Sequence, residues 1–127
     1  MDSKDVVSGF WRAMETNDFF AAAAWLAEDY VLTWPQSGEV MHGREAFGRV
    51  NTEYPSAGRW RFKLRRILAE GPEVVTEVEV TDGNQEAVAI TFHTIVDDKI
   101  SRQREFWPDP FPAPPWRSAW VSVGGET

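Results

Sequence analysis

Apolar residues near the start of the chain recur at spacings of three and four, the pattern of a helix that buries one face. This stripe comprises Val6, Val7, Phe10, Trp11 and Met14. We expect Ser3 or Asp5 to cap the helix and the run Thr16-Asn17-Asp18 to end it after about Glu15. The aspartate of that run then caps a second short helix over residues 19–26, which contains four consecutive alanines.

The next residues favour strands and a third helix. Residues 30–34 are mostly β-branched or aromatic and predict a strand that Pro35 stops. Residues 39–42 run back as a short second strand after a turn. Gly43 then opens a third helix that extends to about Glu53.

The second half of the chain alternates between apolar and polar residues, which is typical of strands with one buried face. Turn residues divide it into four strands, over residues 59–69, 73–81, 85–96 and 99–107. Two or three N-terminal helices followed by this meander predict an α+β domain. A curved antiparallel sheet would wrap around the helices.

Basic residues gather on the first strand of the meander, and acidic residues gather on the second. Pairing Ala69 with Glu73 across the loop places Arg65 opposite Glu77, and Lys63 opposite Glu79. Each such pair stabilises the sheet by ~0.2–1 kcal/mol. We therefore interpret the basic strand as a solvated face rather than a nucleic-acid surface.

Composition narrows the function classes. A chain of 127 residues has room for one domain, and a formal charge of −7 disfavours binding to nucleic acid or an anionic membrane. The absence of cysteine excludes disulfides and thiolate chemistry. The chain has no apolar run of the ~20 residues that a membrane helix needs, and its start does not resemble a signal peptide. We expect a soluble cytoplasmic protein.

The C-terminal tail is unusual, because five prolines fall between Pro108 and Pro115 with aromatic residues among them. One interpretation is a proline-rich recognition ligand. The aromatic rings favour a second, in which Phe111, Trp116 and Trp120 anchor an extended segment on the domain or its partner. We therefore divide the chain into a domain over residues 1–111 and a packed tail over residues 112–127.

Several motifs support a family resemblance. Residues 26–35, after the two helices, look like the opening of the nuclear transport factor 2-like superfamily. Residues 37–47 resemble its SnoaL-like group, in which a short hairpin meets a "G-R-x-x-F" helix. Residues 96–102 and 105–109 are similar to that group's final hairpin, although Asp98 stands where glycine is usual. The resemblance covers residues 1 to about 111 and implies a cone with a deep central pocket, commonly dimeric.

Strand register predicts which side chains face that pocket. If Asp97-Asp98 is a two-residue turn, Phe92 lies opposite Gln103 and Ile90 lies opposite Glu105. The resemblance places Trp107 in the pocket, so Glu105 points inward. His93 then points outward, on a sheet face suited to dimerisation. A one-residue slip would bring His93 inward.

Ketosteroid isomerase chemistry does not fit the residues that the resemblance aligns. The position of the family's general base holds Trp34, and that of its oxyanion-hole tyrosine holds Phe10. The position of its protonated aspartate holds Phe92, or Thr91 if the turn differs. None of these rings can accept a proton as a base or donate to an oxyanion in those roles.

Glu105 is the better catalytic candidate, because apolar neighbours would raise its pKa toward neutrality. The alternative is a structural carboxylate paired with Arg12 or Arg104. Asp109 matches an aspartate that SnoaL-like cyclases use near the end of the last strand, although it is also a plausible turn residue between two prolines. An epoxide-hydrolase-like set would need two interior carboxylates, and only Glu105 can be placed inside.

Other chemistry has little support. His42 and His93 lack a metal-ligand spacing, and no phosphate-binding or dinucleotide motif is present, so we predict no metal and no cofactor. The predicted ligand-binding residues are Phe10, Met14, Trp34, Phe92, Gln103 and Trp107. Such a pocket favours a flat, largely apolar small molecule. Two hypotheses remain: acid/base catalysis of a cyclisation, dehydration or isomerisation, or a non-catalytic module for binding or dimerisation.

Overall fold

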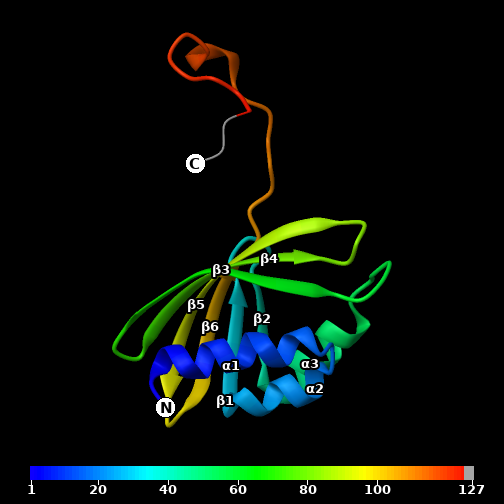
Figure 1. Cartoon of the computed structure of the whole chain (residues 1–127), viewed down its shortest axis with the longest axis vertical. Coiled ribbons are helices and arrows are strands. Elements are labelled where there is room, and N and C mark those ends of the chain that lie inside the picture. Colours follow the sequence, from blue (N-terminus) through cyan, green and yellow to red (C-terminus); the bar gives the residue numbers. More distant parts are fainter. Residues whose placement is uncertain (125–127) are drawn as a thin grey trace.

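The computed structural model describes residues 1–124 and confirms the predicted α+β class (Figure 1). One six-stranded sheet has the order β2-β1-β6-β5-β4-β3 and curves around the helices without closing. Four of its pairings are antiparallel, whereas β1 and β6 run parallel, so the sheet is mixed. The strands are β1 (Leu26–Trp34), β2 (Glu39–His42), β3 (Arg61–Glu70), β4 (Glu73–Thr81), β5 (Glu86–Val96) and β6 (Lys99–Phe106).

The helices all lie on the concave face of the sheet (Figure 1). They are α1 (Ser3–Glu15), α2 (Phe19–Ala22), the 3₁₀ turn η1 (Ala23–Trp25) and α3 (Gly43–Glu53). The N-cap of α1 is Asp2 rather than Ser3 or Asp5, because Asp2 and Asp5 form a reciprocal capping box. The predicted second helix is shorter than expected, since the chain enters β1 already at Leu26.

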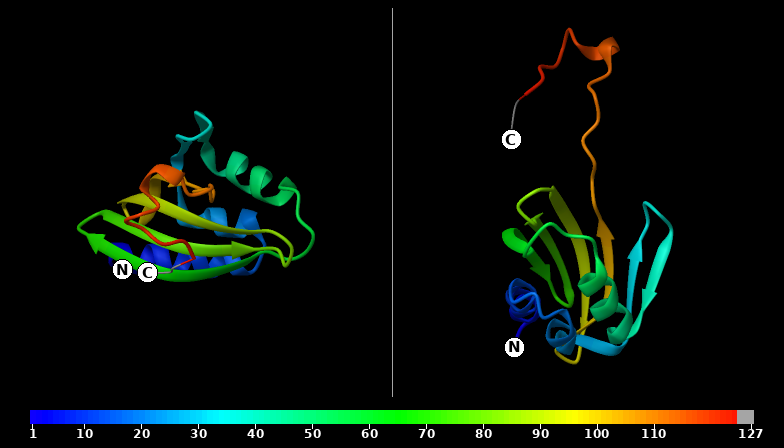
Figure 2. Two further views of the ribbon diagram at one scale, coloured as in Figure 1. Left: turned by 90° about the horizontal axis from the view of Figure 1, so that it is seen from above. Right: turned by 90° about the vertical axis from the view of Figure 1, so that its right-hand side faces the viewer.

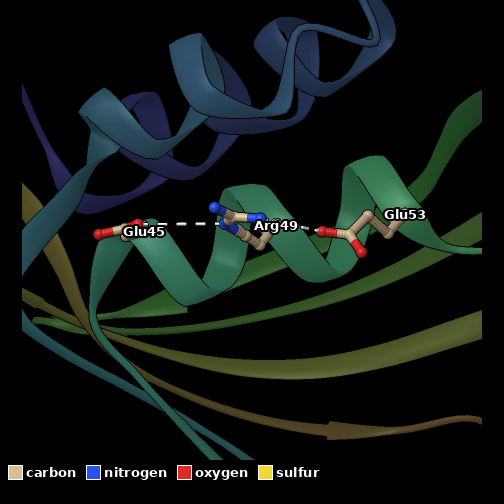
Figure 3. A network of polar contacts seen from close by, with 3 residues as sticks. All are labelled: Glu45, Arg49 and Glu53. Atoms are coloured by element: carbon tan, nitrogen blue, oxygen red, sulfur yellow. Dashed lines mark hydrogen bonds and ion pairs between the residues drawn. The ribbon is translucent and has the colours of Figure 1, made fainter.

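The apolar stripe of α1 packs onto the sheet and contributes a continuous part of the core. All five of its predicted members are buried, together with inward side chains from the strands such as Leu32, Val74 and Ile100. The outward side of α3 carries a short row of ion pairs instead, in which Arg49 lies between Glu45 and Glu53 (Figure 3). Such exposed pairs are worth only ~0.3–0.5 kcal/mol each, so α3 is held by its inner face.

Two β-bulges affect the predicted registers. In the β3–β4 pair Glu70 rather than Ala69 lies opposite Glu73, so the predicted pairing was wrong there and Arg66 rather than Arg65 lies opposite Glu77. Arg65 is an extra residue on β3, and this bulge restores the predicted pairing of Lys63 with Glu79. In the β5–β6 pair the turn is as predicted, with Val96 opposite Lys99. Ser101 is then an extra residue on β6 and moves every later pairing by one.

This second bulge reverses the predicted faces of β5. His93 now lies opposite Gln103, and Thr91 lies opposite Glu105. His93 is fully buried, so its predicted place on the outer face was wrong. Phe92 takes that place and is 45% exposed. The inward direction of Gln103 and Glu105 was correct.

After β6 the chain leaves the domain as an extended arm, which we define as residues 108–124 (Figures 1 and 2). The arm contains one 3₁₀ turn, η2 (Pro115–Arg117). Phe111 and Trp116 are each 75% exposed and Trp120 is 79% exposed, so these rings do not pack on the arm's own domain. Residues 125–127 of the predicted tail lie outside the described residues.

No helix in the described part of the chain is long and apolar enough to cross a membrane. The location in the cytoplasm stays a prediction.

Gly9 allows the closest contact between the helices. A Cβ added to Gly9 would lie 2.2 Å from Cη2 of the Trp25 indole. Gly9→Ala should therefore destabilise the protein by about 1–3 kcal/mol, measured by urea unfolding. In a Trp25→Leu background the same change should stabilise it by about 0.5–1 kcal/mol, because only the helix propensity of alanine then remains. The same sign in both backgrounds would contradict this account.

Candidate functional site

A cavity of about 500 Å³ opens between the helices and the inner face of the sheet. Nine of its lining residues are aromatic: Phe10, Trp11, Phe19, Trp34, Phe47, Tyr54, Trp60, Phe62 and Trp107. Gln103 and Glu105 contribute polar atoms from β6, and Asp109 lies at the end of the cavity where the arm begins. The volume is within the range of small-molecule sites in proteins.

The carboxylate of Glu105 accepts three hydrogen bonds from neutral groups. Its Oε1 accepts from the indole N–H of Trp34 at 3.0 Å and from that of Trp107 at 3.1 Å. Its Oε2 accepts from the hydroxyl of Thr91 at 2.7 Å. A carboxylate has about four acceptor positions, so one position on Oε2 stays available.

Glu105 has no ionic partner within residues 1–124. The side chain is only 7% exposed, and neither Arg12 nor Arg104 forms an ion pair with it. The alternative prediction, an ion pair of Glu105 with Arg12 or Arg104, was therefore wrong. Burial raises the pKa of Glu105 above its usual value, and the bonds from Trp34, Thr91 and Trp107 oppose that shift.

Trp107 is held in place by the turn between β1 and β2. Its backbone N–H donates to the Gln36 side-chain carbonyl at 2.5 Å, and its carbonyl accepts from the Gln36 amide at 3.1 Å. These two bonds fasten the end of β6 beside the end of β1. They therefore orient the indole ring that donates to Glu105.

Behind the cavity, buried polar side chains form a continuous line of hydrogen bonds. The Tyr30 hydroxyl donates to Oε1 of Gln103, and the Gln103 amide donates to Nδ1 of His93 at 2.9 Å. His93 Nε2 therefore carries the ring proton and donates to Thr76 Oγ1 at 2.8 Å. The same oxygen accepts from Trp11 Nε1 at 3.3 Å.

This line keeps His93 neutral. Burial lowers the pKa of His93 to about 3. A proton on Nδ1 would also point at the amide donor of Gln103. Burial raises the pKa of Tyr30, and the nearby charge of Glu105 adds to that effect. Neither ring is ionised near neutral pH.

The structure brings together most of the predicted site residues. Phe10, Met14, Trp34, Gln103, Glu105, Trp107 and Asp109 all line the cavity. Phe92 does not, because the bulge at Ser101 turns it to the outer face, so its predicted place in the pocket was wrong. The catalytic and binding roles of these residues stay predictions.

Sequence reasoning missed Thr91, His93 and Tyr30 as parts of the site. The possible slip of one residue was the only signal for the inward direction of His93. Nothing in the sequence around Ser101 indicates a bulge. Among residues 1–124 no three histidine, aspartate or glutamate side chains gather in a way that could hold a metal ion.

The SnoaL-like domain model matches residues 7–103. The chain belongs to the SnoaL-like family. The resemblance stated from the residues is thereby confirmed. A search of the curated proteins finds no significant match.

Two solved structures support the SnoaL-like assignment at 30% identity or more. A Kribbella flavida protein, provisionally called a ketosteroid isomerase, is 31% identical with a TM-score of 0.88, covering 98% of this chain and 90% of that one. A Burkholderia xenovorans protein of unknown function, described as NTF-2 like, is 30% identical with a TM-score of 0.77. That match covers 97% of this chain and 95% of the other.

A third solved structure shares only the fold. It is a provisional polyketide cyclase from Sinorhizobium meliloti, 20% identical with a TM-score of 0.67, covering 80% of this chain and 93% of that one. SnoaL-like and related folds thus carry names from different reaction classes. The function of this chain has to be argued from its own site.

The neutral state of His93 predicts how stability depends on pH. The unfolded chain binds a proton at His93 near pH 6.5, whereas the folded protein does so only near pH 3. Between these values the unfolded state holds the extra proton, so this group lowers the free energy of unfolding as the pH falls, by at most about 1.4 kcal/mol per pH unit. Glu105 acts in the opposite direction, because its raised pKa means that the folded state binds a proton first.

Comparison with His93→Gln isolates the histidine. Urea unfolding should show the variant less stable than the wild type at about pH 7, because the ring contacts are lost. The difference should shrink steadily toward about pH 4, since glutamine takes up no proton. A difference that stays constant over this range would show that His93 is protonated normally in the fold.

Proposed function

We propose that the protein binds a small, flat, largely apolar molecule in the aromatic cavity and that Glu105 transfers a proton to or from it. The observation that carries this proposal is the buried carboxylate of Glu105, which lines the cavity and accepts hydrogen bonds only from neutral donors among residues 1–124. The reaction would be of the cyclisation, dehydration or isomerisation type.

The surroundings of Glu105 suit proton transfer. A carboxyl group whose pKa is raised toward neutrality exchanges protons with weakly acidic or basic substrate atoms more efficiently than an exposed one. The two indole N–H groups and the Thr91 hydroxyl fix its orientation, so the unused position of Oε2 is where a substrate proton would arrive. The aromatic rings would orient a flat substrate beside it.

Asp109 is the second carboxylate in this proposal. It lies at the cavity lining where the arm begins, and it is more exposed than Glu105. A second carboxyl group at the rim would connect the buried carboxylate with solvent. We assign Asp109 the role of exchanging protons with solvent.

The residues of this cavity do not support the ketosteroid isomerase mechanism. Trp34 occupies the position of the base and donates its N–H to Glu105. Phe10 is buried at the position of the oxyanion-hole tyrosine, and Thr91 faces inward at the position of the aspartate. The proton would instead be transferred by Glu105, which lies on β6.

Native mass spectrometry of the gently purified protein tests this function. We expect a retained small molecule, and loss of that molecule in Ala87→Trp, which fills the cavity lining from an exposed position on β5. With the retained compound as substrate, Glu105→Gln should lower kcat by about 10²–10⁴-fold. The matched control is Glu45→Gln, which removes an exposed carboxylate outside the cavity and should leave kcat unchanged.

An unchanged kcat in Glu105→Gln would remove the catalytic role and leave the non-catalytic binding module. A compound retained equally by Ala87→Trp would show that it binds outside the cavity.

We also propose that two copies of the chain assemble through the outer face of the sheet and the arm. On the outer face Phe92 packs edge-on against Phe106, with ring centroids 6.3 Å apart, and the Arg104 guanidinium lies 5.4 Å from the centre of the Phe106 ring. The arm presents Trp116 and Trp120 without a partner surface in its own domain. Its five prolines restrict it to extended conformations before assembly, which reduces the entropy lost on binding.

Subunit number tests the assembly. Native mass spectrometry and size-exclusion chromatography should show a dimer for the wild type. Phe92→Arg and the double variant Trp116→Ser/Trp120→Ser should each raise the dissociation constant by at least about tenfold, because large aromatic contacts dominate interface energies. Phe20→Ser, which changes an exposed aromatic residue of α2 on the helical side of the domain, is the matched control and should stay dimeric. A monomeric wild type would contradict the proposal.

A further inference from the structure

The charged side chains that line the cavity within residues 1–124 are all acidic. Four acidic side chains line it, and among residues 1–124 no lysine, arginine or histidine does. The acidic lining residues are Glu39, Glu86, Glu105 and Asp109. Three of them are exposed and one is buried, so negative charge extends from the solvent-accessible rim to the interior.

Basic side chains that might balance this charge bind elsewhere. Arg44 pairs with Glu28 at 3.5 Å, and Arg49 lies between two glutamates on the outside of α3. Arg66 pairs with Glu77 across the outer face of the β3–β4 hairpin at 3.6 Å. The Lys99 ammonium donates to the Ala24 carbonyl at 2.7 Å.

The buried carboxylate of Glu105 accepts hydrogen bonds but has no positively charged partner among residues 1–124. Two indoles and a hydroxyl solvate the Glu105 carboxylate, and all three donors are neutral. An ionised carboxylate in an apolar interior is normally accompanied by a cation. A cationic group beside the carboxylate would supply the missing charge without displacing any of the three donors, and Oε2 would still be able to accept a proton from the bound molecule.

The aromatic lining is suited to the same group. Aromatic ring faces attract cations, and quaternary ammonium groups are recognised by cages of such rings. The N–H groups of Trp34 and Trp107 converge on one oxygen of Glu105, so both indoles lie beside the carboxylate. A bulky ammonium group in this place would contact aromatic carbon as well as the negative charge.

We infer that the cavity selects a positively charged ligand, an amine or quaternary ammonium group attached to a flat apolar body, with the cation beside Glu105. This inference rests on the proposed binding function and names its ligand class. The rim carboxylates would concentrate cations at the entrance and repel anions. The apolar body would fill the remaining aromatic part of the cavity.

A pair of isosteric probes tests the inference. Phenyltrimethylammonium and tert-butylbenzene have the same shape and differ only in charge. Isothermal titration of the wild type should show that the cation binds at least about tenfold more tightly, equivalent to about 1.4 kcal/mol. This comparison needs no variant, so it holds even if a substitution at Glu105 disturbs folding.

Two variants with the same net charge then locate the effect. Glu105→Gln should remove the preference for the cation, whereas Glu45→Gln, an exposed residue of α3 outside the cavity, should keep it. Ala87→Trp should abolish the binding of both probes.

The outcomes separate this inference from the function on which it rests. Equal or tighter binding of tert-butylbenzene at the cavity would overturn the charge selectivity and leave the apolar binding function intact. No binding of either probe would count against both. A preference that survives in Glu105→Gln would overturn the place assigned to the cation.

Discussion

The structure has to solvate one buried carboxylate with its own neutral groups. Water reaches little of Glu105, and the described residues provide no cation for it. Three elements therefore converge on it: β1 contributes Trp34, β5 contributes Thr91, and the end of β6 contributes Trp107. Leaving any one donor out would cost about 1–3 kcal/mol, because the charged group would lose a bond in an apolar place.

The hydrogen-bonded side chains behind the cavity, from Tyr30 to Thr76, have a different role from the carboxylate of Glu105. Every polar atom from Tyr30 through Gln103 and His93 to Thr76 has a partner, and the described part of the chain contains no buried side-chain nitrogen or oxygen without one. A satisfied network of this kind is rigid and specifies one arrangement of the strands that carry it. It gives the floor of the cavity a fixed shape while its walls are aromatic.

Periodicity predicted the elements well where one face is buried along the whole element. β4 alternates strictly, and its bounds Glu73–Thr81 are those expected. Prediction failed for residue 26, which was placed in the second helix, and for residues 27–29, which were not assigned to the strand. Leu26 instead pairs with Ile100 of β6, a contact more than seventy residues away that local preference does not reveal. The inward place of Glu105 followed from parity on β6 together with the pocket position that the family resemblance gives Trp107. The faces of β5 depended on an extra residue at Ser101 that no turn signal marks.

The two hydrogen bonds between the Gln36 side chain and the backbone of Trp107 limit which residues position 36 can accept in evolution. Pro35 has no N–H and cannot continue the ladder between β1 and β6, so the Gln36 side chain replaces a backbone amide by both donating and accepting. Glutamate would accept but not donate, and asparagine is one methylene too short to reach the same atoms. Position 36 lies in an exposed turn, where substitutions are normally frequent. Descendants of this sequence should nevertheless keep an amide there, whichever side chain stands at position 107, because both bonds are made to the backbone of that residue.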